Sequence, residues 1–158
     1  MDRENFERLV KSSIDFDMHR QLYFYEDEPS GLECVIAVHN TDRGPGVGGC
    51  RLWTYNHAEE AVRDALRLSR GMTYKNAMAE LPFGGGKAVI FAPASGPSNR
   101  KELFSAFGRA VEATGGAYCT AEDVGTGTAD MEIIRQQTGH IFGLADTSGD
   151  PSPFTAYG

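Results

Sequence analysis

The sequence of this 158-residue chain lacks the features of several common functional classes. It has no apolar run near the roughly 20 residues of a membrane-spanning helix, and its polar start, DRENFERLV, lacks the apolar region of a signal peptide. Basic residues are outnumbered, 15 against 22 acidic ones, and the net charge of −7 disfavours a nucleic acid or an anionic membrane as partner. We therefore expect a cytoplasmic protein whose partner is a small molecule.

Cysteine is scarce as well, and its placement argues against a disulfide framework or a zinc site. Cys34, Cys50 and Cys119 are odd in number, and no two have the spacing of a metal-binding or redox CxxC pair. Each lies in or beside an apolar stretch, which is typical of small buried residues in a reduced protein. We predict no metal site.

Helix-like and strand-like patterns alternate along the chain, which indicates one α/β domain. We expect a three-layer α/β/α arrangement with a mostly parallel sheet and an antiparallel edge hairpin made by the first two strands. Strands are expected at residues 23–25, 32–38 and 87–92, and from residue 118 onward. An apolar stripe from Phe6 to Ile14 predicts the first helix, and residues 56–76, capped by Asn56, form the second. Ser98 or Asn99 is expected to cap a third helix and Thr128 a fourth.

The most informative stretch, residues 71–87, carries Lys75 and Lys87 on either side of a glycine run. Three consecutive glycines, residues 84–86, predict a loop whose bare backbone N–H groups contact a ligand. Lys87 would then begin a buried strand and direct its amine toward that ligand. Lysines with apolar neighbours serve as general bases or anion anchors. The alternative is two ordinary surface charges, with Lys75 complementing the C-terminal end of its helix.

A second glycine-rich segment, residues 44–49, has the spelling of the G-x-G-x-x-G dinucleotide fingerprint. We reject that interpretation because β-prone residues follow in place of a helix, and because Arg70 stands near the position of the ribose-binding acid. The GGGK run also fails as a phosphate-binding P-loop, since Leu81 and Ala88 occupy two of its motif positions. Residues 44–49 are then a plain turn or a second glycine-lined wall of the same pocket.

The third informative segment, TAEDVGT, follows the strand pattern that starts at Tyr118. Open α/β sheets place ligand contacts where strands end. Glu122 and Asp123 are adjacent and point to opposite faces of a strand, so at most one of them enters a pocket. A turn or cap role for Asp123 is the alternative.

Taken together, GPGVGGCRLWTY, DALRLSRGMTYKNAMAELPFGGGKAVI and TAEDVGT resemble the amino-terminal domain of the glutamate/leucine/phenylalanine/valine dehydrogenases. The resemblance is strongest to the leucine dehydrogenases, through WTYN, GMTYKNA and the closing DPSPFTAYG. It implies that residues 1–150 form a substrate-binding and oligomerisation domain, and that residues 151–158 begin a linker to an absent NAD-binding Rossmann domain. Hydride transfer needs the nicotinamide held against the substrate, so we expect these 158 residues alone to be inactive.

The resemblance also implies the roles of individual residues. Lys87 and Asp123 match the catalytic pair, and Lys75 matches the lysine that binds the substrate α-carboxylate. The other residues implied to line the substrate site are Gly48, Gly49 and Met72, with Val47 and Ala121 facing the substrate side chain.

The implied activity is NAD-dependent oxidative deamination by a homo-oligomer, with NAD bound mainly by the absent domain. Val47 and Ala121 are small and apolar, so a γ-carboxylate placed beside them would lose its hydration without gaining a partner. We therefore expect leucine as the substrate, with valine and isoleucine accepted. A phenylalanine or valine dehydrogenase, or a non-catalytic binding or assembly module that retains the fold, is the alternative.

Overall fold

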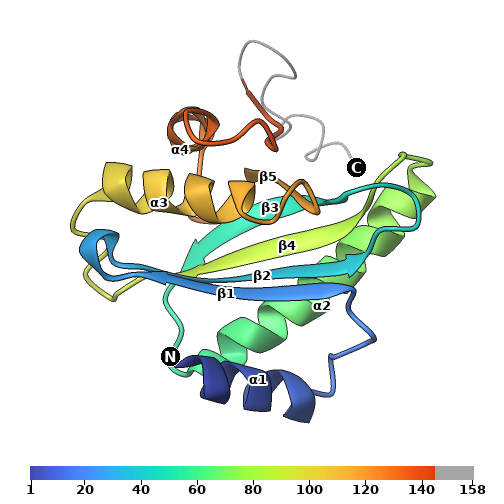
Figure 1. Ribbon diagram of the computed structural model, residues 1–158, viewed down its shortest axis with the longest axis horizontal. Coiled ribbons are helices and arrows are strands. Elements are labelled where there is room, and N and C mark those ends of the chain that lie inside the picture. Colours follow the sequence, from blue (N-terminus) through green and yellow to red (C-terminus); the bar gives the residue numbers. More distant parts are fainter. Residues whose placement is uncertain (145–158) are drawn as a thin grey trace.

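The computed structural model describes residues 1–144, which form one mixed sheet with helices on both faces (Figure 1). In chain order the elements are α1 (Arg3–Ser12), β1 (Gln21–Asp27), a 3₁₀ turn (Glu28–Ser30), β2 (Leu32–Asn40), β3 (Gly46–Trp53), α2 (Ala58–Met78), β4 (Gly84–Phe91), α3 (Arg100–Glu112), β5 (Tyr118–Glu122) and α4 (Thr128–Arg135). Among these helices, none is long and apolar enough to cross a membrane. The expected linker at residues 151–158 lies outside the described residues.

The five strands have the order β1-β2-β4-β3-β5. β1 pairs antiparallel with β2, and β2 antiparallel with β4, whereas β3 pairs parallel with both β4 and β5. Four strands therefore run in one direction and β2 alone runs against them. The mostly parallel sheet and the antiparallel edge hairpin are both confirmed, and Gly31 closes the hairpin turn with a left-handed φ of 71°.

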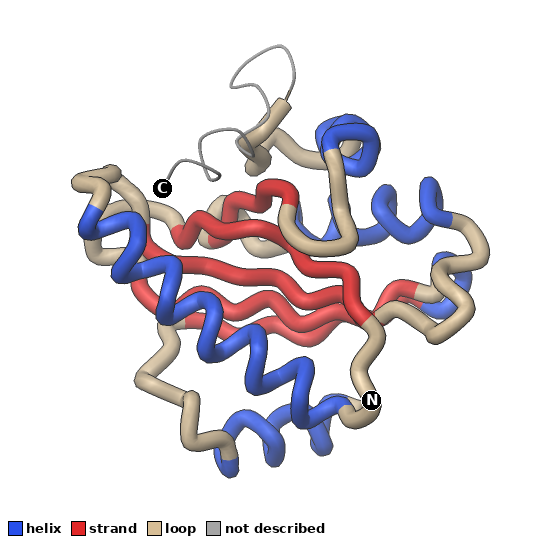
Figure 2. The backbone as a smooth tube through the Cα atoms, turned by 180° about the vertical axis from the view of Figure 1, so that it is seen from behind, coloured by secondary structure: helices blue, strands red, loops and turns tan. Residues whose placement is uncertain are grey.

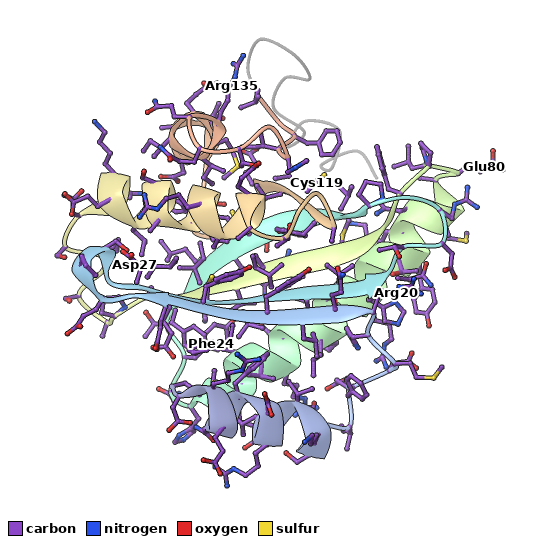
Figure 3. All side chains as sticks on the ribbon, in the orientation of Figure 1. Arg20, Phe24, Asp27, Glu80, Cys119 and Arg135 are labelled. Atoms are coloured by element: carbon purple, nitrogen blue, oxygen red, sulfur yellow. The ribbon has the colours of Figure 1, made fainter. Side chains whose placement is uncertain are left out.

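Helices α1 and α2 cover one face of the sheet, and α3 and α4 cover the other (Figures 1 and 2). Strand β2, which lies between β1 and β4, contributes to both layers because its alternate residues point to opposite faces. Cys34, Ile36 and Val38 belong to the cluster under α3, while Val35 and Ala37 belong to the cluster under α2. On the edge strand, Phe24 stacks on Phe6 of α1 with ring centroids 5.6 Å apart, and Figure 3 labels its position. The three-layer architecture is thus confirmed.

The glycines of the GGGK run do not form the expected loop, and that prediction is wrong. Residues 84–86 begin strand β4, where they are buried. A Cβ atom at Gly84 would collide with the carbonyl oxygen of Asn40, and one at Gly85 with the backbone of α2. At Gly86 it would lie 2.6 Å from the ring of Tyr118. These glycines let neighbouring backbones approach closely, which outweighs their poor intrinsic preference for strands.

The first glycine-rich segment is likewise mostly strand. Residues 46–49 belong to β3, so the plain-turn interpretation holds only up to Pro45. The strand continues to Trp53 with no helix after the last glycine, and the rejection of the dinucleotide fingerprint is therefore confirmed for this segment.

The predicted helix ends need small corrections. α1 ends at Ser12, and Ile14 lies beyond it with 85% of its surface exposed. The N-cap of α2 is His57 rather than the expected Asn56. The backbone N–H of Asn56 instead donates to Glu60 Oε2 at 3.2 Å. Asn99 caps α3 as expected, because its Oδ1 accepts from the N–H of Glu102.

At α4 the cap falls one residue earlier than expected. Gly127 is the N-cap residue, and its N–H donates to Asp130 Oδ2 at 3.0 Å. Thr128 is instead the first helical residue. A side chain three residues into the helix thus reaches back to hold the helix start.

Candidate active site

The centre of the candidate site is a hydrogen-bonded pair, Lys87 and Asp123. Lys87 lies in β4 with only 7% of its side chain exposed, and its Nζ donates to Asp123 Oδ2 at 2.6 Å. A buried lysine is rare unless it is paired, and this pair supplies the partner. One small substrate requires Lys75, Lys87 and Asp123 to converge on one cleft, with their charged atoms within about 10 Å of each other, and this prediction is confirmed for Lys87 and Asp123.

The pair crosses an intervening strand. β3 lies between β4 and β5, so Lys87 reaches Asp123 over β3. At the level of Lys87, β3 carries Gly49, which has no side chain to obstruct the contact. A Cβ at Gly49 would lie 2.6 Å from the Glu122 carbonyl oxygen and 2.7 Å from Asp123 Cβ. Gly49 is therefore required for the close approach of β3 to the turn that carries Asp123.

The backbone around Asp123 forms a turn that is fixed onto β3. The N–H of Asp123 donates to Thr126 Oγ1 at 2.8 Å, and the N–H of Thr126 donates back to the Asp123 carbonyl at 3.0 Å. Thr126 Oγ1 also donates to the carbonyl of Cys50, and the N–H of Leu52 donates to Val124 O. The proposed turn role of Asp123 and its place in the site are thus compatible, since its backbone makes the turn and its carboxylate faces Lys87.

Two cations keep the Asp123 carboxylate ionised. Burial raises its pKa, but the hydrogen bond and charge of Lys87, together with the charge of Arg51, outweigh that effect and lower the pKa from its ordinary value. Arg51 Nε donates to the same Oδ2 atom at 3.2 Å. Sequence reasoning missed Arg51, and the available signal was a charged residue inside the strand-like run CRLW.

The predicted substrate-site residues lie on β3, on β5 and on the side of α2 that contacts β3. Gly49 pairs with Ala121 of β5, and Val47 pairs with Cys119. A Cβ at Gly48 would lie 3.1 Å from Met72 Cγ of α2. Val47, Met72 and Ala121 are half-buried, so each keeps some surface that a ligand can contact. The structure thus places Gly49 beside Asp123, and Met72 beside Gly48, while the contact of these residues with a substrate stays a prediction.

Lys75 lies in the last turn of α2 with an exposed side chain, three residues after Met72 and therefore on the same side of the helix. Its convergence with Lys87 and Asp123 stays a prediction. The next residue, Asn76, is buried, and its Nδ2 donates to Gly84 O at 2.6 Å and to Val47 O at 3.4 Å. Asn76 was also missed from the sequence, and it joins the end of α2 to the two glycine strands that form the site.

The three cysteines, all within the described residues, are buried and form no disulfide. Cys50 is closest to the site along the chain, and burial raises the pKa of its thiol to about 11. A thiol that stays protonated at neutral pH is a poor nucleophile. The chemistry available at the site is therefore that of an amine and a carboxylate, which suits proton transfer and stabilisation of an oxyanion.

Comparison with known proteins gives the context of this geometry. The sequence model of a family described as "Glu/Leu/Phe/Val dehydrogenase, dimerisation domain" matches residues 18–140. The leucine dehydrogenase of Bacillus subtilis (strain 168) is 52% identical over 143 residues, covering 89% of this chain and 39% of that protein. The valine dehydrogenase of Streptomyces virginiae is 47% identical over 143 residues, covering 89% of this chain and 40% of that protein. The chain thus spans about two fifths of the length of these curated relatives.

Solved structures agree with the sequence comparison. The L-tryptophan dehydrogenase of Nostoc punctiforme superposes with a TM-score of 0.73 and 37% sequence identity, covering 87% of this chain and 38% of that one. The hetero-hexameric glutamate dehydrogenase of Thermus thermophilus superposes with a TM-score of 0.67, over 93% of this chain and 41% of that one. At 22% identity, the second likeness shows the fold alone.

Proposed function

This chain belongs to the glutamate/leucine/phenylalanine/valine dehydrogenase family, and from that premise we propose that the full-length protein containing it oxidatively deaminates branched-chain L-amino acids with NAD. The residues described here form the substrate-binding and oligomerisation part of that enzyme. The single observation that carries the proposal is the 2.6 Å Lys87–Asp123 pair, which reaches across β3. A family member kept only as a scaffold would have no need for this buried pair.

The overall reaction converts the L-amino acid, NAD⁺ and water into the 2-oxo acid, NADH, ammonium and a proton. NAD, when bound, supplies the acceptor for the hydride that leaves the α-carbon. Among the described residues, the segment with the spelling of a dinucleotide fingerprint, residues 44–49, continues as strand β3 and is not followed by a helix. We therefore propose that another part of the full-length protein binds NAD. The residues of this chain bind the amino acid, orient it and move its protons.

Asp123 is the proton acceptor in this scheme. Its lowered pKa keeps it ionised at neutral pH, so it takes a proton from the substrate ammonium and later returns one to the departing ammonia. After Asp123 has released the ammonium proton to solvent, it accepts the proton of the water that attacks the imine carbon, and Lys87 donates a hydrogen bond that stabilises the carbinolamine oxygen. Lys75, on the exposed end of α2, binds the substrate α-carboxylate.

Substrate preference follows from the wall that Val47 and Ala121 provide. Burying an unpaired γ-carboxylate against two apolar residues costs on the order of several kcal/mol, whereas each buried methylene of a branched side chain contributes about 0.8 kcal/mol. Leucine is therefore the proposed substrate, with valine and isoleucine accepted. The similarity to phenylalanine, valine and tryptophan dehydrogenases makes another apolar amino acid the second candidate.

The test is steady-state kinetics of the full-length protein with NAD and a panel of L-amino acids. We expect leucine to have the highest kcat/KM and glutamate a value at least about 100-fold lower, because several kcal/mol separate the two bound states. A glutamate kcat/KM equal to that of leucine refutes the pocket argument. A clear phenylalanine preference refutes only the choice among apolar substrates, and no oxidation of any amino acid refutes the function.

We further propose that the full-length protein is a homo-oligomer, in line with the family description as a dimerisation domain. Multi-angle light scattering on the full-length protein would return a mass of at least two subunits. A single-subunit mass at high protein concentration contradicts this part of the proposal.

A further inference from the structure

Behind the Lys87–Asp123 pair, a chain of charged groups continues from the site to helix α2. Arg51 of β3 contacts two carboxylates at once, through Nε to Asp123 Oδ2 at 3.2 Å and through Nη1 to Asp64 Oδ2 at 3.0 Å. Only 21% of the Arg51 side chain is exposed, and Asp64 is covered to a similar extent. A half-buried arginine held between two carboxylates differs from an ordinary surface ion pair, whose long side chains stay mobile.

Asp64 is itself fixed from two further directions. The hydroxyl of Tyr55 donates to Asp64 Oδ2 at 3.0 Å, and Arg67 Nη2 donates to Asp64 Oδ1 at 3.0 Å. Both oxygens of this carboxylate are therefore engaged, which restricts its rotation on α2. Since Asp64 is held in this way, it fixes the orientation of the guanidinium that it binds.

We propose that Arg51 is a positioning residue for Asp123, and that Asp64 on α2 holds Arg51 in the orientation that this task requires. Arg51 and Lys87 both donate to Asp123 Oδ2, from β3 and β4 respectively, so the carboxylate has a defined orientation between two strands. With Lys87 alone, one flexible amine would hold the carboxylate and could follow its rotation. The catalytic consequence of this arrangement rests on the proposed dehydrogenase function, whereas the positioning itself does not.

The guanidinium is suited to this task in a way that an ammonium is not. Its Nε and Nη1 atoms lie in one rigid plane and reach the two carboxylates in different directions. A lysine at position 51 would supply one point charge and could not bridge both partners with fixed geometry. We therefore expect Arg51→Lys to hold Asp123 better than Arg51→Met does, but less well than the wild-type arginine.

The first experiment reads the position of Asp123 without any assay of activity. The full-length protein is labelled with ¹³C-aspartate, and the infrared carboxylate band of Asp123 is identified at neutral pH as the band lost in Asp123→Asn. Arg51→Met is expected to shift and broaden this band, since one of two charge-assisted hydrogen bonds to Oδ2 is lost. Arg63→Met is the matched control, because Arg63 is on the same helix as Asp64 but pairs with Asp15 at 2.9 Å. A band that stays unchanged in Arg51→Met overturns the proposal.

The second experiment separates positioning from substrate binding by kinetics on the full-length protein. Arg51→Met is expected to lower kcat by about 10- to 100-fold with the KM for leucine within about twofold, as expected when a reacting group is misplaced. Arg51→Lys recovers part of the loss, and Arg63→Met stays at the wild-type value. If Arg51→Met instead raises KM at unchanged kcat, Arg51 contacts the substrate and the proposal is wrong.

The role of Asp64 is tested by a double-mutant cycle. Asp64→Asn is expected to lower kcat less than Arg51→Met does, and the double variant is expected to be no slower than Arg51→Met alone, because both changes act through one contact. Fully additive losses show that Asp64 acts independently and overturn its part of the proposal. If the wild-type protein oxidises no amino acid, the proposed function fails, and the infrared bands of Asp123 in Arg51→Met and Asp64→Asn still decide the positioning.

Discussion

The substitution Gly49→Ala tests the geometric requirement at the site with a single methyl group. Its Cβ would lie 2.6 Å from the Glu122 carbonyl oxygen, and an ordinary contact begins at 3.4 Å, so the end of β5 has to move by about 0.8 Å. Asp123 follows Glu122 directly and must move with it. If the Asp123 carboxylate moves away from Lys87 by that amount, the present 2.6 Å hydrogen bond between them becomes longer than a good hydrogen bond allows.

The expected effect on the full-length enzyme is a loss of kcat of about 100-fold, the scale associated with misplacing a reacting group by about 1 Å. Crowding inside the sheet should also lower the free energy of unfolding by about 1–3 kcal/mol. Both quantities are measurable, by steady-state oxidation of leucine and by chemical denaturation.

Gly71→Ala provides the matched control for this glycine substitution. Gly71 lies inside α2, and a Cβ there would meet open space among the described residues. An alanine in a helix interior is more favourable than glycine by about 0.5–1 kcal/mol, so this variant should be more stable and keep the wild-type kcat. The reasoning is refuted if Gly49→Ala keeps wild-type kcat and stability, because β5 would then tolerate the methyl group without displacing Asp123.

Three further predictions concern neighbouring residues. The pKa of Asp123 is lowered in the folded state, so the contribution of its charge to stability is complete above about pH 5 and disappears as the pH falls through the folded-state pKa. In urea unfolding at different pH values, Asp123→Asn should therefore lose less stability on acidification than the wild type does. An identical loss in the two proteins contradicts this prediction. Asn76→Ala leaves the Gly84 carbonyl without its 2.6 Å donor, so the free energy of unfolding should fall by about 1–3 kcal/mol. The KM for leucine should rise because the end of α2 is held less firmly, and an unchanged KM argues against a link to substrate binding. Cys50 is buried with its pKa raised to about 11, so it should react with a thiol reagent only on unfolding, and fast labelling of the native protein contradicts the packing.

Much of the fold was predictable because it follows from local patterns. The nearly continuous apolar run of β2 indicates a strand covered on both faces, and the structure places β2 between β1 and β4 with alternate residues in two separate clusters. Pro29 and Gly31 predict the turn of the edge hairpin, which is confirmed. Periodicity also predicts α2, including the position of Lys75 on its last turn.

The glycine segments were mispredicted for a physical reason. Local propensity disfavours glycine in strands, and nothing near Gly84 or Gly85 in the sequence shows that Asn40 and the backbone of α2 pack against them. These contacts join residues that are distant along the chain, so they exist only once the sheet and α2 are assembled. The helix starts were off by a single residue, as at Thr128, because a glycine cap held by Asp130 has no side chain of its own to signal it.

The candidate site shows the same division. Lys87 and Asp123 were singled out from their sequence context, the family resemblance implied that they form a catalytic pair, and the structure brings them into contact. Arg51 and Asp64 were not predicted, because their link to Asp123 depends on how β3, the turn after β5 and α2 are placed relative to one another. The spacing of these residues along the chain does not predict how the three elements are placed.

The central claim is that Lys87 and Asp123 form the reacting pair of an amino-acid dehydrogenase. Its most direct test is the rate of NADH formation from leucine by the full-length wild-type protein and by Asp123→Asn, which keeps the shape of the side chain and removes its charge. We expect turnover by the wild type and a kcat lower by a factor of about 10² or more in the variant, the range for loss of a general base. An Asp123→Asn enzyme that oxidises leucine as fast as the wild type would contradict the claim.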